Sequence, residues 1–573
     1  MLNKLMSQPS PSPAKARFMR LAALFQKGAL DEAEKETKAA LATAPKDPNY
    51  LHLAAQIAEA RGEQSRAIML YRKALMVNPE WMEAEYNLAR VLADVKEYGE
   101  SLALMQKVTT KRPDLPPVWE SLAKINQRAG KLRDAIAAWA KAIKLAPQNV
   151  DFRSQCWLLR AQVCDWAETP APDQPLTPQA AIVFFNDPAL QKKAAISYSA
   201  SKYGRIAPLP AATHAPHTRL RIGYLSADFQ AHATAWLMAE LFELHDKTAF
   251  EIFVYSTGAD DKSSIRQRIE NSAAHFIDLR NTADLDAAQR IRGDEIDILI
   301  DLKGHTRGNR LGIFAHRPAP KQIHWLGYPG TLGAPFIDGF VGDAIALPKS
   351  LEPFFTERVL RLPASYQIND RQRAIAEPLS RAEYGLPENA IILASFNQTY
   401  KITPTLFTLW CDILKERPAT ILWLLESNAT AAENLRKEAE KRGINPARLV
   451  FAKPTALEDH LARYKIVDLA LDTFPVGGHT TTSDALWAGC PVVTLIGQSF
   501  ISRVAASLLH AANLPDLVTE DLAAYKNKIL SLIDDPAARR ALRQKLTGDR
   551  DNLPLFDTPR FVKDWEKLLK SLY

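Results

Sequence analysis

The sequence predicts an α/β protein with an all-α repeat region at its N-terminus and two parallel sheets after it. Three observations predict this order. Proline recurs every 34 residues through the first quarter of the chain, and from Arg219 onward short apolar runs alternate with helical stretches. The chain of 573 residues is also longer than one hydrophobic core normally supports, so we expect several domains.

The repeat region is marked by columns of residues that keep the same phase. Its members are Pro45, Pro79, Pro113 and Pro147; Gly28, Gly62 and Gly130, with Lys96 in the third place; and Ala33, Ala67, Ser101 and Ala135. Small residues let two helices cross closely, and proline ends the second helix of each unit. A period of 34 residues is the length of the tetratricopeptide repeat, whose arrays this region resembles. We therefore expect four such repeats over residues 14–149, which form a superhelix with a concave face for peptides.

The remaining chain predicts a connector and two doubly wound domains. Residues 150–217 read as a capping helix over 152–166 and a proline-rich linker with one helix. Strands are expected at 219–226, 251–257, 295–302 and 321–328, then at 390–397, 419–426, 448–453, 467–473 and 491–496. Helices between them imply right-handed βαβ units. We expect one Rossmann-like half over 218–370 and a second over 371–573, with the join within 343–388 and a ligand cleft at the strand ends.

Composition and charge exclude several classes of protein. No apolar run is long enough for a transmembrane helix, and the proline-containing N-terminus does not read as a secretory signal, so we expect a cytoplasmic protein. Four cysteines without a CxxC pair predict free, mostly buried thiols. Residues 1–150 hold 23 basic against 16 acidic residues, so the net charge of +7 lies there and the rest of the chain is balanced. This location favours acidic protein partners over nucleic acid.

Residues 469–495, LALDTFPVGGHTTTSDALWAGCPVVTL, are the most specific segment of the chain. A strand ends near Asp472, a glycine turn follows, and His479, Thr480 and Thr481 open a helix. Free N–H groups and the positive dipole end of a helix N-terminus suit a diphosphate, and Asp484 can accept hydrogen bonds from a ribose. An ordinary threonine-capped helix with a core histidine is the alternative. The chain contains no GxGxxG, P-loop, HExxH or GxSxG motif.

This segment resembles the catalytic domain of the O-linked N-acetylglucosamine transferases, glycosyltransferase family 41. Further similar segments are SADFQAHATAWLM, DLKGHTRGNRLGIFAHRPAPKQIHWLGYPGTLGAPFIDGFVGD and SFNQTYKITP, so the resemblance covers essentially the whole chain. It implies a tetratricopeptide superhelix followed by two Rossmann-like domains in the GT-B arrangement. The short repeat array is typical of a bacterial member.

The resemblance implies a set of donor contacts in the second half. Lys401 matches the lysine at the donor diphosphate, and Gln398 matches a neighbouring nucleotide contact. The other contacts that it implies are His479, Thr480 and Thr481 at the phosphates, Asp484 at the ribose, and His460 and Arg463 beside the uracil. Because an ammonium group can stabilise the leaving diphosphate, we expect neither a metal nor a cofactor.

The resemblance places His232 and Thr306 at the sugar and the acceptor. His232 matches the active-site histidine, which either takes the hydroxyl proton itself or leaves it to the departing α-phosphate or a water chain. Thr306 matches a sugar-binding position. Leu457 and Ala233 depart from the family pattern, which has a ribose-contacting lysine in some members at the first position and commonly proline at the second.

The implied activity is inverting transfer of N-acetylglucosamine from UDP-GlcNAc to serine or threonine hydroxyls of proteins, with the repeats guiding the acceptor. A SPINDLY-like protein O-fucosyltransferase that uses GDP-fucose is the main alternative, and His479 favours the UDP reading. An N-glucosyltransferase of the same family is a weaker alternative because those proteins lack an evident repeat array. An inactive transferase domain that serves as a repeat-based adaptor is the remaining hypothesis.

Overall fold

The computed structural model describes residues 13–211, 215–548 and 550–573. It separates into two compact units, Met1–Cys156 and Trp157–Tyr573. Each unit is described by itself below. The first unit is all helical, and the second contains two parallel sheets, which confirms the predicted fold class.

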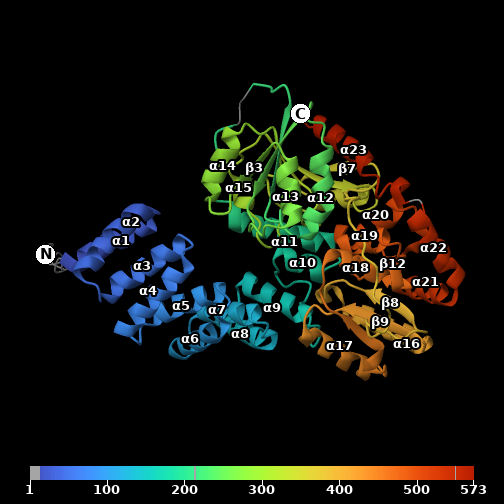
Figure 1. Ribbon diagram of the computed structural model, residues 1–573, viewed down its shortest axis with the longest axis horizontal. Coiled ribbons are helices and arrows are strands. Elements are labelled where there is room, and N and C mark those ends of the chain that lie inside the picture. Colours follow the sequence, from blue (N-terminus) through green and yellow to red (C-terminus); the bar gives the residue numbers. More distant parts are fainter. Residues whose placement is uncertain (1–12, 212–214, 549) are drawn as a thin grey trace. The chain divides into compact units, whose positions relative to one another are not determined.

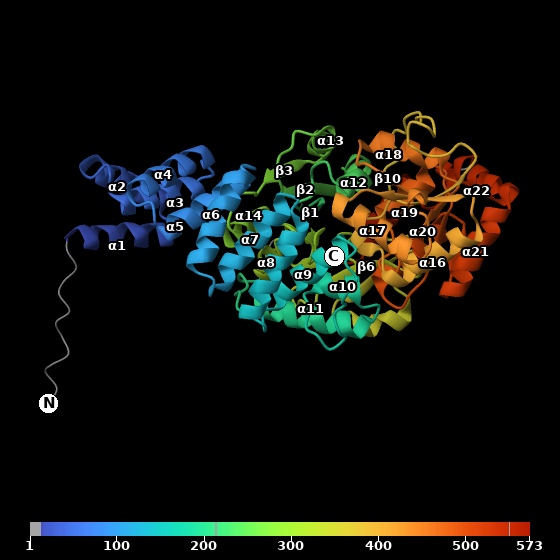
Figure 2. The same cartoon turned by 90° about the horizontal axis from the view of Figure 1, so that it is seen from below.

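The first unit consists of helix pairs that follow one another along the chain (Figures 1 and 2). Its helices are α1 (Pro13–Gln26), α2 (Leu30–Thr43), α3 (Pro48–Ala60), α4 (Gln64–Val77), α5 (Met82–Asp94), α6 (Tyr98–Lys111), α7 (Pro116–Arg128) and α8 (Leu132–Leu145); α9 (Val150–Gln162) begins in this unit. Each odd-numbered helix from α1 to α7 packs against the helix after it, and α2, α4 and α6 also pack against the next pair. The 34-residue period therefore corresponds to one helix hairpin.

Small residues lie where the two helices of each pair cross. Ala33, Ala67 and Ala135 are completely buried, and so is Ser101, which takes the same place in the third pair. The Ser101 hydroxyl donates to the carbonyl oxygen of Ala89 at 2.6 Å, so the polar group has a partner inside the core. The predicted small-residue column is thus the close contact of the hairpin.

A left-handed backbone turn joins the two helices of each pair. Gly28, Gly62 and Gly130 have φ of 76°, 76° and 75°, and Lys96 has φ of 68° in the third pair. A residue with a Cβ atom is strained in this region of backbone space, whereas glycine is not. Glycine recurs in this column because the turn requires a left-handed backbone. Lys96 adopts the same left-handed conformation and is strained by it.

The connector between repeats and sheets contains two helices, where the sequence predicted one. They are α10 (Pro178–Phe184) and α11 (Pro188–Tyr203), and each has proline in its first turn. The Asp187 carboxylate caps α11 by accepting from the N–H groups of Ala189 and Leu190. Prolines that predicted an irregular linker thus mark helix starts.

The first sheet has seven parallel strands in the order β3-β2-β1-β4-β5-β6-β7. The strands are β1 (Leu220–Ser226), β2 (Phe250–Ser256), β3 (His275–Asp278), β4 (Ile298–Asp301), β5 (Lys321–His324), β6 (Gly339–Asp343) and β7 (Arg358–Leu362). The connecting helices are α12 (Ala233–Leu244), α13 (Ser264–Ser272), α14 (Asp284–Gly293) and α15 (Leu311–Ala315), with η1 (Lys349–Phe354) before β7. Strand β7 lies within the stretch that the sequence predicted to be the join, so this stretch belongs in part to the first sheet.

The second sheet repeats the same strand order with six parallel strands, β10-β9-β8-β11-β12-β13. They are β8 (Ile391–Ser395), β9 (Thr420–Leu425), β10 (Leu449–Ala452), β11 (Leu469–Leu471), β12 (Val492–Leu495) and β13 (Val518–Thr519). The helices are α16 (Pro404–Glu416), α17 (Ala429–Lys441), α18 (Leu457–Arg463), α19 (Thr480–Trp487), α20 (Val504–Ala511), α21 (Leu522–Asp534), α22 (Pro536–Gly548) and α23 (Thr558–Lys570). The short 3-10 helices are η2 (Thr399–Lys401), η3 (Pro446–Arg448), η4 (Tyr464–Ile466), η5 (Phe500–Ser502), η6 (Pro515–Leu517) and η7 (Arg550–Asn552).

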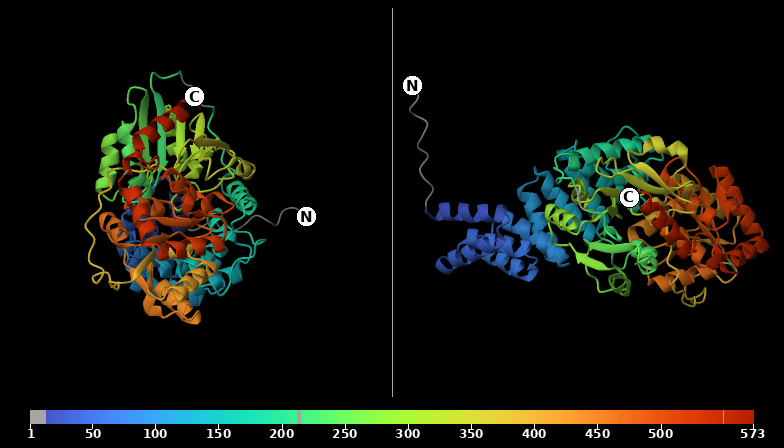
Figure 3. Two further views of the ribbon diagram at one scale, coloured as in Figure 1. Left: turned by 90° about the vertical axis from the view of Figure 1, so that its right-hand side faces the viewer. Right: turned by 90° about the horizontal axis from the view of Figure 1, so that it is seen from above.

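The last helix, α23, returns to the first sheet and packs against α12 and β7 (Figures 1 and 3). Trp565 on this helix is fully buried, and its indole N–H donates to the Tyr224 hydroxyl at 2.7 Å. Its ring stacks on Trp325 with centroids 4.3 Å apart. One hydrophobic cluster contains side chains of both sheets and of α23, so the two halves share a continuous core.

Replacing Lys96 by glycine is expected to stabilise the repeat unit by about 0.5–1 kcal/mol, because it removes the strain of a left-handed residue. Urea unfolding of the helical unit within the full chain, followed by far-UV circular dichroism, measures this change. Gly62→Ala is the matched control with the opposite sign, since no atom lies within 4 Å of the added Cβ and only the backbone penalty remains. A lower unfolding midpoint for Lys96→Gly would contradict the argument.

Candidate active site

Most of the predicted site residues follow the strands at which the strand order of each sheet reverses, whereas His460 and Arg463 on α18 follow the edge strand β10. In the first sheet these strands are β1 and β4, and in the second they are β8 and β11. Loops from such a pair of strands diverge to opposite faces of the sheet and leave a binding position between them. His232 follows β1 and Thr306 follows β4, whereas Lys401 follows β8 and His479 follows β11. Both halves therefore present their chemical groups at equivalent places.

Lys401 ends the 3-10 helix η2, and its ammonium group is held by neutral oxygen atoms. Nζ donates to Asn397 Oδ1 at 3.1 Å and to the carbonyl oxygen of Gly477 at 3.0 Å. Burial lowers the pKa of Lys401 to about 8, and the nearby Asp472 carboxylate opposes this shift. The lysine thus remains charged at neutral pH, and no described carboxylate forms an ion pair with it. Gln398, which the sequence also predicted to contact the donor, starts the same short helix with an exposed side chain.

Asp472 holds the glycine turn between β11 and α19. Its Oδ1 accepts the Gly478 N–H at 2.6 Å, and its Oδ2 accepts the Thr494 hydroxyl from β12 at 2.6 Å. Burial raises the pKa of this carboxyl to about 6, although these hydrogen bonds favour its charged form. A side chain at Gly478 would lie 2.4 Å from the Thr482 hydroxyl oxygen, so the turn has no space for one. The sequence had not indicated a role in the site for Asp472.

The predicted helix start after this turn is present, with His479 at the N-cap position of α19. Thr480 and Thr481 form its first turn and are partly exposed, whereas Asp484, one turn further, is buried. The first N–H groups of any α-helix lack an intrahelical acceptor. Burial, together with the nearby charge of Lys401, lowers the pKa of His479 to about 3, so its ring is neutral. This end of the helix offers donors next to a cation.

Asp484 forms a buried ion pair with Arg373, 111 residues earlier in the chain. Arg373 Nη1 lies 2.7 Å from Asp484 Oδ1, and the arginine lies over the Trp487 ring with its Cζ 5.0 Å from the centroid. Burial raises the pKa of Asp484 to about 6, and the arginine opposes that shift. The carboxylate predicted for ribose binding is therefore fixed by a residue that the sequence did not single out.

The segment that carries Arg373 is anchored to the first half by further ion pairs. Arg268 on α13 pairs with Asp370, and Arg371 Nε donates to Glu240 on α12 at 2.9 Å. Arg373 Nε in turn donates to the carbonyl oxygen of Asp370 at 3.0 Å. The position of Asp484 in the second half thus depends on side chains of the first half.

His460 and Arg463 lie together on α18, beside a cluster of aromatic rings. The His460 ring centroid is 5.4 Å from that of Phe396 and 5.5 Å from that of Tyr464, and burial lowers the pKa of His460 to about 4. Arg463 is 7% exposed, with its Cζ 6.0 Å from the Tyr384 ring centroid. Within the described residues, its Nε and Nη1 atoms are buried without a hydrogen-bond partner. Buried donors without a partner are uncommon in folded proteins, so Arg463 stands out within this helix.

His232 is the N-cap residue of α12, and its ring lies beside a buried ion pair. Its Nδ1 accepts the N–H of Thr234 at 3.2 Å and lies 3.5 Å from Asp228 Oδ2. The side chain is 45% exposed. Desolvation by the surrounding loop nevertheless lowers the pKa of His232, with Lys303 adding to the effect and Asp228 opposing it. The lowered pKa favours the neutral form of His232 near pH 7.

Lys303 and Asp228, which carry no site role in the sequence reading, form the ion pair beside His232. Lys303 Nζ lies 2.8 Å from each carboxylate oxygen of Asp228, and both residues are buried. The carbonyl oxygen of Lys303 accepts the Thr306 hydroxyl at 2.8 Å, so the predicted sugar contact lies in the same loop. The sequence did not predict this ion pair because 75 residues separate its two charges.

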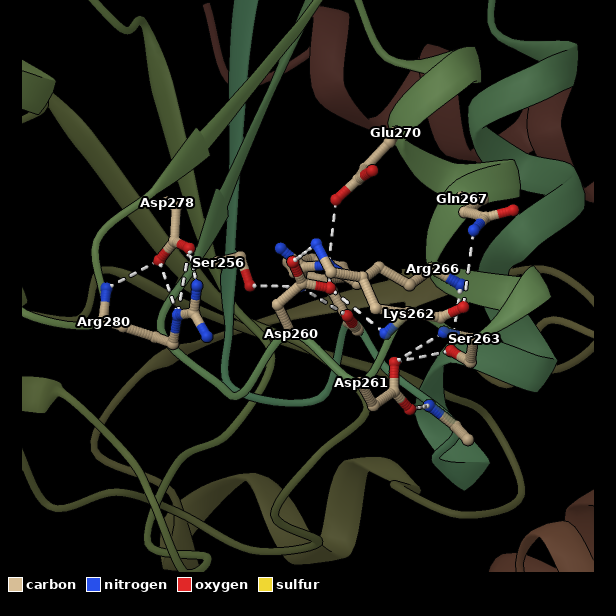
Figure 4. A network of polar contacts seen from close by, with 12 residues as sticks. Ser256, Asp260, Asp261, Lys262, Ser263, Arg266, Gln267, Glu270, Asp278 and Arg280 are labelled. Atoms are coloured by element: carbon tan, nitrogen blue, oxygen red, sulfur yellow. Dashed lines mark hydrogen bonds and ion pairs between the residues drawn. The ribbon is translucent and has the colours of Figure 1, made fainter. Parts of the chain in front are cut away.

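A network of polar contacts after β2 braces the loop that holds His232 (Figure 4). Asp261 Oδ2 accepts the Ala231 N–H at 2.7 Å, while Asp261 Oδ1 accepts the backbone N–H of Ser263 at 3.1 Å and its hydroxyl at 2.7 Å. Arg266 Nη1 donates to the carbonyl oxygen of Phe229 at 3.0 Å. The loop is thus held on both sides of Gln230, although Ala233 replaces the proline common in the family.

The structure arranges the predicted residues in two groups. Two of them, His232 and Thr306, belong to the first half. The second half contains the other eight, which are Gln398, Lys401, His460, Arg463, His479, Thr480, Thr481 and Asp484. Among the described residues, no hydrogen bond or ion pair joins the groups directly. Tyr400, adjacent to Lys401, and Val476, in the glycine turn, pack in a hydrophobic cluster with Leu225 and Tyr328 of the first half. Apolar contacts between the two halves thus hold the two groups of predicted site residues on neighbouring parts of the fold.

Arg373→Met is expected to destabilise the catalytic unit by about 3–5 kcal/mol, because Asp484 is left buried without its cation. The pKa of Asp484 should rise above its value of about 6 for the same reason. Adding Asp484→Asn in the same chain should recover much of the loss, since no buried charge then lacks a partner. Urea unfolding followed by tryptophan fluorescence compares these variants with Arg540→Met, whose arginine is exposed. Equal stability of Arg373→Met and Arg540→Met would refute the proposed pairing energy.

No helix in the described ranges has the length and apolar character needed to cross a membrane. No disulfide bond involves any of the four cysteines, and all four are buried, as the sequence predicted. In the described part of the chain, no group of three or more histidine, cysteine or acidic side chains is placed to hold a metal ion.

Known proteins are similar to this chain over about two thirds of its length. The chain is 37% identical over 405 residues to a probable UDP-N-acetylglucosamine–peptide N-acetylglucosaminyltransferase SEC of Arabidopsis thaliana, with 68% of this chain and 42% of that protein covered. It is 31% identical over 468 residues to the UDP-N-acetylglucosamine–peptide N-acetylglucosaminyltransferase of Caenorhabditis elegans, with 62% and 41% covered. The chain thus spans about two fifths of the length of these curated relatives.

A solved structure has the same architecture over nearly the whole chain. It is a mutant of the Thermobaculum terrenum O-GlcNAc transferase, with 26% identity, a TM-score of 0.66, and 99% of this chain and 98% of that chain covered. The family model described as glycosyl transferase family 41 matches residues 207–379 and 377–565. These two ranges contain every predicted site residue. The chain belongs to glycosyl transferase family 41.

Proposed function

We propose that this chain transfers N-acetylglucosamine from UDP-GlcNAc to serine or threonine hydroxyls of proteins, with inversion at the anomeric carbon. The observation that carries the proposal is Lys401, a partly buried cation whose hydrogen-bond partners among the described residues are neutral, beside the first turn of α19. Names of the relatives from Arabidopsis thaliana and Caenorhabditis elegans support this donor and a peptide acceptor. The adaptor alternative is disfavoured because the cation and the helix start are both retained.

The diphosphate is proposed to lie between Lys401 and the first turn of α19. Its negative charge increases as the bond to the sugar breaks, so a nearby cation stabilises the transition state more than the ground state. The N–H groups and hydroxyls of Thr480 and Thr481 supply neutral donors at the same end of the helix. His479, which has no charge of its own at neutral pH, adds the contact that favours UDP over GDP in the sequence reading.

The uridine is proposed to lie along α18 and α19. Arg463 and the flat, neutral ring of His460 lie together on α18 and are proposed to contact the uracil. Asp484, held by Arg373, is placed to accept from the ribose hydroxyls. Gln398 supplies a further nucleotide contact from the start of η2.

The sugar and the acceptor are proposed to lie toward the first half, near Thr306 and His232. The acceptor hydroxyl attacks the anomeric carbon from the face opposite UDP, so the new C–O bond forms as the bond to the diphosphate breaks. The repeats are proposed to guide acceptor proteins, and the excess of basic residues in 1–150 suits acidic segments of such partners. In this proposal Lys401 provides the cation, so that neither metal nor cofactor is required.

The donor is identified by incubating the purified chain with UDP-GlcNAc, UDP-glucose or GDP-fucose and an acceptor peptide library. Binding of each nucleotide sugar is measured, and transfer of its sugar is measured by mass spectrometry. We expect transfer from UDP-GlcNAc. Lys401→Ala should weaken UDP binding by about 10- to 100-fold, the range for a lost hydrogen bond to a charged group. Binding of GDP-fucose alone would replace our donor assignment with the fucosyltransferase alternative. Absence of binding by all three would favour the adaptor.

The affinity for UDP is expected to fall as pH rises above about 8, because Lys401 loses its proton there in the free protein. A bound diphosphate favours the ammonium form, so binding above this pH must take up a proton and weakens by up to about tenfold per pH unit. Calorimetric titration with UDP at pH 7 to 9, in buffers of different ionisation enthalpy, measures both effects. Lys401→Met should bind weakly without this dependence, whereas Lys415→Met, which changes an exposed lysine on α16, should behave like the unmodified chain. Unchanged pH dependence in Lys401→Met would assign the titration to another group.

A further inference from the structure

Two partners compete for the Nδ1 atom of His232. The N–H of Thr234 points at Nδ1 from 3.2 Å and requires its lone pair, whereas Asp228 Oδ2, 3.5 Å away, would require a proton on the same atom. A neutral imidazole carries only one proton. If Nδ1 accepts from Thr234, that proton lies on Nε2, and the ring presents an N–H donor on its other side.

Lys303 decides this competition. Its Nζ lies 2.8 Å from both oxygens of Asp228, and its side chain is 5% exposed. A buried ion pair of this geometry compensates most of the carboxylate charge that would otherwise attract a proton to Nδ1. The arrangement is the opposite of a catalytic base dyad, in which a carboxylate accepts from Nδ1–H and leaves a lone pair on Nε2.

We propose that Lys303 is a positioning residue which, by binding both oxygens of Asp228, places the proton of His232 on Nε2 and makes this histidine a hydrogen-bond donor instead of a base. The inference deepens the proposed function and rests on it for the reaction that His232 serves. The ring orientation itself follows from Thr234, because His232 is the N-cap of α12. Lys303 acts only through Asp228 and needs no contact with the substrate.

Four charged groups face the loop that carries His232. Asp228 lies on the loop, Lys303 comes from the loop after β4, and Asp261 comes from the loop after β2, where it accepts the Ala231 N–H. Arg266 on α13 donates to the carbonyl oxygen of Phe229. Asp261 and Arg266 remain in place in every variant below. Changes in the titration of His232 therefore report the other two.

The first experiment observes the imidazole directly. NMR of the chain labelled with ¹³C and ¹⁵N in histidine, with the His232 signals assigned from His232→Asn, gives the tautomer and the pKa. We expect the Nε2–H form in the unmodified chain and a raised His232 pKa in Lys303→Met, where Asp228 keeps its charge alone. Lys303→Arg can bind both oxygens of Asp228 and should restore the original tautomer. Lys303→Met with Asp228→Asn should also return toward the original pKa, because both charges are absent.

The control is Lys321→Met, since Lys321 is an exposed lysine of the same half. An Nδ1–H form in the unmodified chain, or an unchanged His232 pKa in Lys303→Met, would overturn the proposal. Neither readout requires an active enzyme. Failure of the proposed function would instead appear as no sugar transfer by the unmodified chain, so the two failures are distinguishable.

The second experiment separates donor from base by side-chain geometry. The amide nitrogen of glutamine reaches the place of Nε2, whereas the side chain of asparagine reaches only that of Nδ1 and still caps the helix. If His232 donates, His232→Gln should retain a kcat at least about tenfold above those of His232→Asn and His232→Ala at saturating UDP-GlcNAc. Lys303→Met should lower kcat with little change in KM for UDP-GlcNAc, and Lys303→Arg should recover it. Equal losses in the three His232 variants would favour a base.

Discussion

The loops of the candidate active site depend on buried carboxylates at the carboxyl ends of the central strands. Asp301 ends β4 and accepts the N–H groups of Lys303 and Gly304, and Asp472, directly after β11, accepts that of Gly478. β4 and β11 are the equivalent strands of the two sheets. Burying a carboxylate costs free energy unless hydrogen bonds compensate, so each loop must fold back over its strand end. The same constraint fixes Lys303 in one half and the start of α19 in the other.

The elements that the sequence predicted are those with strong periodicity or long apolar runs. The 34-residue columns predicted the helix hairpins, and the buried strands β1, β2, β8 and β9 coincide with the expected runs. The strands that were not predicted are β3, β6, β7 and β13. β3 is largely exposed at a sheet edge, β6 contains two glycines in five residues, and β13 has two residues. Pairing with a neighbour, and not the local sequence, determines these strands.

The site could be predicted only where its signal was local or carried by resemblance. The glycine turn and the helix start around His479 lie within one segment. The order of residues alone therefore indicated a helix N-terminus that suits an anion. Lys303 and Arg373 gave no such signal, because each acts through a carboxylate 75 or 111 residues away. A lysine in a loop is usually exposed to solvent, and only the fold shows that Lys303 is buried against Asp228. Ion pairs of this kind require the three-dimensional structure.

The two halves differ in the partners of their central lysines, Lys303, which is buried, and Lys401, which is partly buried. In the first half, Asp228 neutralises Lys303, and His232 is also uncharged, so this side offers donors and acceptors without net charge. In the second half, Lys401 has the oxygens of Asn397 and Gly477 as partners and keeps its charge for a ligand. In the proposed function, a negative diphosphate is therefore favoured next to the second sheet, whereas a neutral sugar and hydroxyl lie next to the first. This difference in charge is proposed to orient the donor before any contact to the sugar is made.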